Sequence, residues 1–170
     1  AQQKMYEEHA RALGYRKVSE LKKDVAYTIR AYVDAGGFLF SMCSATDSYD
    51  IALAAGNTDI CQSVFDGDPV DPGWASKLDY TRCFAFTGFT LFTSPEIYEY
   101  SDIDTTPRHR SAAASRTDGY FTLFEFSAKF DPVPAMLTQN HVSVIHDFMG
   151  QTTAFHEEKI KSSVVIMAKK

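Results

Sequence analysis

Residues 36–55 read GGFLFSMCSATDSYDIALAA, and this stretch decides the predicted fold. A glycine pair leads into the apolar run Phe38–Met42, then Cys43, and then small and apolar residues at helical spacing. The pattern predicts a buried strand, a tight turn at Cys43 and a helix over residues 44–55. A side chain on such a turn projects from the carboxyl edge of a sheet, where helix N–H groups favour a thiolate.

A helix is predicted ahead of the strand, over Ser19–Val33. Its apolar stripe consists of Leu21, Val25, Ile29 and Val33, spaced four residues apart. The glycine pair that follows stops the helix, because glycine accepts left-handed dihedral angles. Helix, strand, turn and helix make one αβα unit, which predicts an α/β fold with a mainly parallel sheet between layers of helices.

The rest of the chain is predicted to be rich in short strands. Residues 66–73 carry Asp, Gly and Pro and predict a surface loop, and residues 105–119 predict a mobile loop. The predicted strands are Arg82–Phe86, Thr90–Phe92 and Ile97–Tyr100, which form a β-rich insertion, followed by Tyr120–Phe126, Val133–Gln139 and Val164–Met167.

Composition limits the class of protein. With 170 residues, 45% of them hydrophobic, residues 1–170 are expected to form a single domain. A net charge of −5 without a basic stripe argues against nucleic acid as a partner. No apolar run approaches the roughly 20 residues of a membrane span. The chain starts without Met inside a predicted helix, so we expect it to be truncated at its N-terminus.

Cys43 is the candidate nucleophile, although its position alone slightly favours a buried structural role, because free cysteines are often buried. Cys61 and Cys83 are expected to be packing residues. A cysteine nucleophile needs a base, and among the five histidines His141 is best placed because it directly follows a predicted strand. The other four histidines are expected at the surface.

Two segments carry a resemblance to a known superfamily. Residues 36–45, GGFLFSMCSA, resemble the nucleophile elbow of class I glutamine amidotransferases, whose domains are flavodoxin-like three-layer sandwiches. Residues 134–141, PAMLTQNH, resemble the second signature of that superfamily, in which a strand ends at the catalytic histidine. The chain therefore looks like the carboxyl-terminal part of a class I glutamine amidotransferase-like domain.

A narrower resemblance runs through nearly the whole chain. Residues 38–54, 65–69 and 148–155 are similar to a family of Bacteroidetes-type bacteria whose members are commonly labelled asparagine synthetase B. The family members are longer and often carry an export signal. The resemblance implies a bacterial protein that is exported to the periplasm, whereas the residues alone leave localisation open.

The resemblance implies cysteine-dependent amide hydrolysis or transfer on a small-molecule amide, without a cofactor. Cys43 is the nucleophile and His141 the base, Ser44 and Ala45 belong to the oxyanion-binding elbow, and Gln139 and Asn140 bind substrate. The acid behind the histidine stays open between Asp147, Glu157 and an upstream residue. The alternative function is a non-catalytic binding module that has lost the catalytic pair.

A metal site is not predicted. Asp66, Asp68 and Asp71 resemble a calcium loop in their density of oxygen atoms, but the later bidentate glutamate of an EF-hand is missing. A surface turn is the favoured interpretation. His141, His146 and His156 lack the i, i+4 spacing of a zinc protease, so zinc is not expected either.

Overall fold

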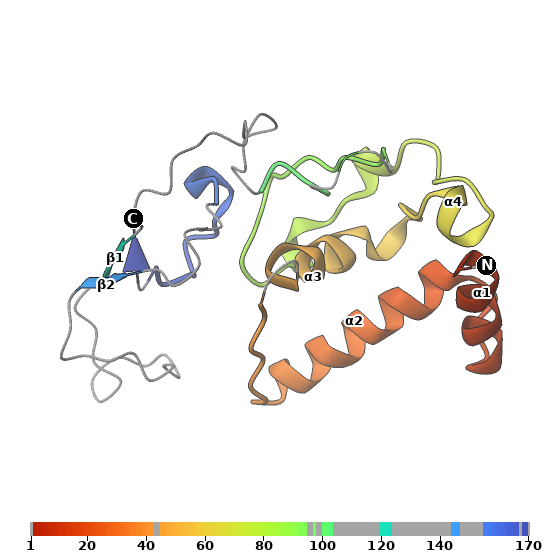
Figure 1. Cartoon of the computed structure of the whole chain (residues 1–170), viewed down its shortest axis with the longest axis horizontal. Helices are drawn as coiled ribbons and strands as arrows, with labels where there is room; N and C mark the ends of the chain where they lie inside the picture. The colour runs from red at the N-terminus through yellow and green to blue at the C-terminus, as the bar shows by residue number, and fades with distance from the viewer. Residues whose placement is uncertain are drawn as a thin grey trace. The chain divides into compact units, whose positions relative to one another are not determined.

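The computed structural model describes residues 2–42, 45–94, 97, 100–103, 120–123, 144–146, 155–166 and 168–169. The chain divides into two compact units. The first comprises Ala1–Asp104 and Phe155–Lys161, and the second Thr105–Ala154 and Ser162–Lys170. All helices of the described residues lie in the first unit, and the three strands lie in the second (Figure 1).

The described residues of the first unit form four α-helices and four short 3-10 helices. The α-helices are α1 (Gln2–Ala12), α2 (Val18–Asp34), α3 (Ala45–Ala54) and α4 (Ser63–Asp66). The 3-10 helices are η1 (Ala55–Asn57), η2 (Trp74–Lys77), η3 (Tyr80–Arg82) and η4 (Glu157–Lys159). Helix α1 packs against α4, and α2 against α3 (Figure 1). The helices predicted over residues 19–33 and 44–55 are thus confirmed as α2 and α3.

The buried face of α2 differs from the predicted stripe. The buried residues of the helix are Val18, Ser19 and Ala26, whereas Val25 is exposed. The small side chain of Ala26 leaves room for Tyr49 of α3, whose hydroxyl donates a hydrogen bond of 2.6 Å to the Ala26 carbonyl oxygen. Close approach between the helices therefore selects the small residue, and the apolar stripe is turned partly to solvent.

The core of the first unit lies between α3 and the irregular segments that follow it. Its buried cluster consists of Ile51, Ala54, Cys83, Phe86, Phe89, Leu91 and Ile103. Trp74, Phe155 and Ile160 pack against this cluster. The ring of Tyr80 meets that of Phe89 edge to face at 4.9 Å between centroids, and its hydroxyl donates a hydrogen bond of 2.6 Å to the Phe89 carbonyl oxygen.

In this core, a buried carboxylate accepts the backbone hydrogen bonds that a neighbouring strand would otherwise accept. Asp50 of α3 is 2% exposed and accepts hydrogen bonds from the N–H groups of Phe84, Ala85 and Phe86, at 2.7, 2.8 and 2.9 Å. The predicted strand Arg82–Phe86 is therefore wrong. The backbone donors that a sheet ladder would use go to one side chain, and only Phe86 forms an isolated bridge, with Ile160.

The second unit contains one small antiparallel sheet among its described residues. Its strands are β1 (Tyr120–Leu123), β2 (Val144–His146) and β3 (Ala168–Lys169), in the order β2-β1-β3. The register pairs Tyr120 with His146, Phe121 with Ile145, Thr122 with Val144 and Lys169, and Leu123 with Ala168. The strand predicted from Tyr120 is confirmed over four residues.

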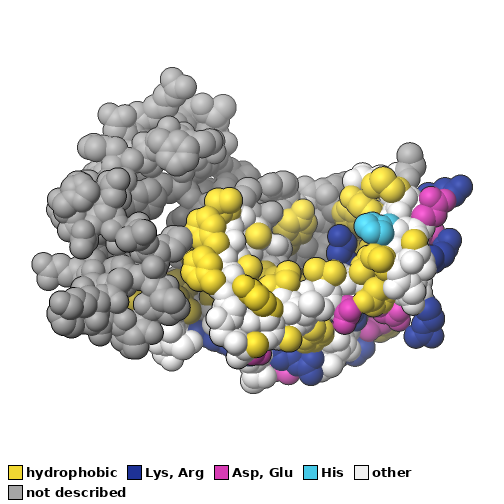
Figure 2. All heavy atoms as spheres, turned by 90° about the horizontal axis from the view of Figure 1, so that it is seen from below, with side chains coloured by type: hydrophobic (Ala, Val, Ile, Leu, Met, Phe, Trp, Pro, Cys, Tyr) yellow, Lys and Arg dark blue, Asp and Glu magenta, His cyan; other side chains and the backbone are white. Residues whose placement is uncertain are grey.

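The α/β fold class with a parallel sheet is wrong. Phe38–Met42, the predicted central strand, has no strand structure, and Phe38, Phe40 and Met42 are 58, 53 and 66% exposed. A strand of a parallel sheet is buried on both faces and hydrogen-bonded to neighbours. No described segment pairs with these residues, and no described strands pair in parallel. Figure 2 shows hydrophobic atoms at the surface of the described part.

The remaining predicted strands have different outcomes. Thr90–Phe92 contributes only an isolated bridge from Leu91 to Ser101, and residues 164–166 are not strand. Residues 105–119 and 133–139 lie outside the described part of the chain. Among the described helices, none has both the length and the apolar character to cross a membrane, as the sequence predicted.

Candidate functional site

The predicted catalytic residues fall largely outside the described part of the chain. Cys43, Ser44, Gln139, Asn140 and His141 are not among the described residues. The described member of the predicted elbow is Ala45, and it is the first residue of α3.

The start of α3 agrees with the helical half of the predicted elbow. The N–H of Ala45 donates a hydrogen bond of 3.1 Å to the carbonyl oxygen of Met42, and the helix continues to Ala54. Five residues along, Asp50 fixes the helix to the backbone of residues 84–86. The helix that follows Cys43 in sequence is thus firmly held, while the strand expected before it is absent from Phe38–Met42.

The other two cysteines are poor nucleophiles. Burial raises the pKa of Cys83 to about 12, and its thiol donates a hydrogen bond of 3.3 Å to the carbonyl oxygen of Asp50. Burial also raises the pKa of Cys61 to about 12, and a hydrogen bond from this thiol to the Asp66 carboxylate adds to the effect. Both thiols stay protonated near neutral pH, so the expectation of a packing role is confirmed for the buried Cys83.

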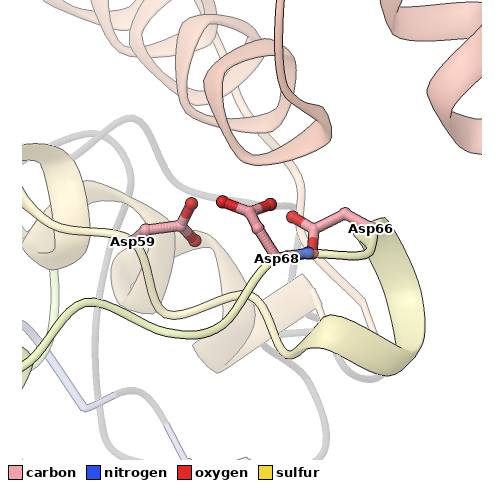
Figure 3. A group of neighbouring side chains, drawn as sticks. All are labelled: Asp59, Asp66 and Asp68. Atoms are coloured by element: carbon pink, nitrogen blue, oxygen red, sulfur yellow. The ribbon is translucent and has the colours of Figure 1, made fainter.

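Three carboxylates converge beside the N-terminus of α2. Carboxylate oxygens of Asp59, Asp66 and Asp68 lie within 4.8 Å of one another (Figure 3). Asp66 is the last residue of α4, and Gly67 caps that helix with a left-handed φ of 87°. The reversal at Gly67 brings the N–H of Asp68 back to Oδ1 of Asp66, at 3.4 Å. The short sequence DGD therefore places two acids side by side.

Asp59 is the most firmly positioned of the three acids. Its Oδ2 accepts a hydrogen bond of 2.7 Å from the hydroxyl of Ser19 in α2, and its Oδ1 accepts one of 2.9 Å from the N–H of Cys61. The N–H of Asp59 donates to the side chain of Asp71 at 3.0 Å. These contacts join α2 to the loop, so the Asp59 carboxylate is held in place before any ligand arrives.

Lys17 neutralises part of the cluster. Its ammonium group lies 3.6 Å from Oδ2 of Asp59 and forms a hydrogen-bonded ion pair with Asp68. The hydrogen bond that Lys17 donates to Asp68 is the largest cause of the raised pKa of Lys17. Lys17 therefore remains a cation, and it serves two of the three carboxylates.

Asp66 is the carboxylate of the three that Lys17 does not pair with. Its residue is only 9% exposed, and among the described residues its Oδ2 has no hydrogen-bond partner. Burial raises the pKa of Asp66, because removing a carboxylate from water disfavours its charged form. An unpartnered buried oxygen of this kind costs on the order of 1–3 kcal/mol.

The sequence indicated the wrong third member of this cluster. The trio considered as a calcium loop was Asp66, Asp68 and Asp71, but Asp71 turns to Thr58, Lys77 and the N–H of Asp59. The hydrogen bond from that N–H is the largest cause of the lowered pKa of Asp71. The expected turn is confirmed, because Gly67 and Gly73 both have left-handed dihedral angles. The sequence around Asp59 does not indicate that it belongs to the cluster, because only the fold brings it next to the DGD segment.

Comparisons with models of protein families, with curated proteins and with solved structures found no match to the chain.

Proposed function

We propose that this protein is a cysteine-dependent amide hydrolase or amide transferase, with Cys43 as nucleophile and His141 as base. The observation that carries the proposal is the position of Cys43 two residues before α3, which begins at Ala45. Free N–H groups at a helix start stabilise negative charge, both on a thiolate and on an oxyanion. The resemblance of residues 36–45 and 134–141 to the two signatures of class I glutamine amidotransferases supports the same assignment.

The proposed reaction is acyl transfer through a thioester. The Cys43 sulfur adds to the carbonyl carbon of a carboxamide, and the N–H of Ser44 stabilises the resulting oxyanion. His141 takes the thiol proton and delivers it to the departing ammonia as the C–N bond breaks. Water, or the amine of an acceptor, then attacks the thioester and releases the Cys43 thiol. Gln139 and Asn140 are assigned to the binding of the amide substrate.

A covalent trap tests the proposal. The full chain is incubated with an electrophilic glutamine analogue, and the labelled peptide is identified by mass spectrometry. We expect one label on Cys43, none after Cys43→Ala, and slower labelling after His141→Ala. Cys61 and Cys83 are internal controls, because burial raises both pKa values to about 12 and keeps these thiols protonated. Failure to label Cys43 across the neutral and mildly alkaline range would reject the catalytic function.

A second candidate function is a non-catalytic binding module. It is favoured by the exposure of Phe38, Phe40 and Met42 immediately before Cys43. Exposed apolar side chains can contact a ligand or partner, whereas the catalytic elbow requires this segment to be a buried strand. Under this function the chain binds an unreactive glutamine analogue, detected by calorimetry, while Cys43 resists the electrophile. Labelling of Cys43 with release of ammonia from glutamine would exclude it.

A further inference from the structure

We propose that Asp59, Asp66 and Asp68 form a binding site for a calcium ion. Their carboxylate oxygens lie within 4.8 Å of one another (Figure 3). Calcium takes oxygen ligands at about 2.3–2.6 Å, so ligand atoms on opposite sides of the ion are separated by about 5 Å. One ion can therefore contact an oxygen of each carboxylate with little movement of the backbone.

The unpartnered oxygen of Asp66 points to a ligand independently of the clustering. The residue is nine-tenths buried, and its Oδ2 has no hydrogen-bond partner among the described residues. Oδ1 is the oxygen that accepts from the N–H of Asp68. Figure 3 shows the other carboxylate oxygen of Asp66 directed toward the carboxylate of Asp68. A cation between these groups gives Oδ2 the partner that a buried carboxylate oxygen requires.

The charge of the site matches a divalent ion. Three carboxylates face one ammonium group, that of Lys17, so two negative charges remain when all three acids are ionised. Lys17 reaches Asp59 and Asp68, and within the described part of the chain Asp66 has no ion pair. A calcium ion would compensate the two remaining charges and share the Asp59 and Asp68 carboxylates with Lys17.

The ligand set favours calcium over other divalent ions. All three side chains offer oxygen, which hard cations prefer, whereas zinc is usually held by thiolate and imidazole. The acids stand on a short loop and a helix end, at positions 59, 66 and 68, and this spacing follows no regular geometry. Calcium accepts irregular coordination with six to eight oxygens, while magnesium demands a near-octahedral arrangement. Water can supply the further ligands.

The test is a calorimetric titration of the full chain with calcium chloride, and with magnesium chloride for comparison. We expect one saturable calcium site with a dissociation constant of about 10⁻⁴ to 10⁻³ M, the weakest range that protein calcium sites show. Asp66→Asn keeps the shape of the side chain, removes its charge and should weaken binding at least about tenfold. Lys17→Met removes the competing cation and should tighten binding by roughly tenfold. These two substitutions act in opposite directions, which a general loss of folding cannot do.

Asp34→Asn is the matched control. It makes the same chemical change at an exposed position, where Asp34 pairs with Arg30 of its own helix, and should leave calcium affinity unchanged. Absence of saturable calcium heat up to about 10 mM overturns the proposal, as does equal binding by Asp66→Asn and the natural chain. Equal affinity for magnesium overturns the assignment to calcium. Should Asp66→Asn fail to fold by circular dichroism, the Lys17→Met titration decides, and unchanged affinity there rejects the site.

Discussion

Replacing Asp50 should destabilise the first unit more than any other single charge removal in the described residues. Its carboxylate accepts three hydrogen bonds, from the N–H groups of Phe84, Ala85 and Phe86, at 2.7–2.9 Å. Asp50→Ala removes both acceptor oxygens, and with them all three hydrogen bonds, and leaves the donors facing an apolar core. Asp50→Asn keeps one carbonyl oxygen, which can still serve part of the set.

The magnitude follows from the surroundings of the three donors. Phe86 is buried, so its freed N–H carries the full penalty of about 1–3 kcal/mol. Phe84 and Ala85 are partly buried, so their freed N–H groups can bind water, and each lost hydrogen bond lowers the free energy of unfolding by about 1 kcal/mol. The sum for Asp50→Ala is about 3–5 kcal/mol, a large part of the roughly 5–15 kcal/mol that stabilises a typical domain. We expect about half of that loss for Asp50→Asn.

Urea unfolding measures the effect directly. The single tryptophan, Trp74, packs against the core cluster and reports its unfolding by fluorescence. Asp34→Ala, at an exposed helix position, is the control and should cost less than about 1 kcal/mol. If the free energy of unfolding of Asp50→Ala lies within about 1 kcal/mol of that of the unchanged protein, the three hydrogen bonds do not stabilise this segment and the prediction is wrong.

Three further predictions concern the same unit. Burial raises the pKa of Cys83 to about 12, whereas the thiol of an unfolded chain ionises near pH 8.5. The free energy of unfolding should therefore fall as pH rises from about 8.5 toward 12, because only the unfolded state loses the proton in this range. Cys83→Ala should reduce this dependence on pH, measured by urea unfolding at several pH values. Phe89→Ala should cost about 3–5 kcal/mol in the same assay, because it empties a core position and removes the ring contact with Tyr80. Gly67→Ala and Gly88→Ala should each lower the melting temperature, because both glycines have a positive φ that alanine adopts only with strain. A Cβ at Gly67 would meet only flexible side-chain ends, such as that of Gln3, and one at Gly88 meets no atom within 4 Å, so the two losses should be similar; an unchanged melting temperature in either variant would contradict this.

Local patterns predicted the helices and turns well. The bounds of α2 and α3 follow from helical spacing and glycine stops, and the turn after α4 follows from Asp, Gly and Pro in sequence. The strands predicted from short apolar runs were mostly wrong, because periodicity alone cannot distinguish a buried strand from an exposed irregular segment such as Phe38–Met42. A strand also depends on partners elsewhere in the chain, and those are not visible in the run itself.

The acidic cluster shows the same division between local and long-range information. The DGD segment was recognisable as a turn rich in oxygen atoms, and Asp66 and Asp68 belong to it. The contact of Lys17 with Asp68 spans 51 residues, and that of Ser19 with Asp59 spans 40. Neither can be inferred from spacing, so the third acid and the competing cation became apparent only in the folded chain.

The anchoring of residues 84–86 by Asp50 has a consequence for the motions of α3. Because one side chain joins the helix to a segment more than 30 residues away, the two can open to solvent only together. Their amide protons should exchange with solvent as one cooperative group, and more slowly than those of the exposed helix α1. If Cys43 is the nucleophile, its reaction would take place next in sequence to α3, a helix expected to open to solvent less often than α1.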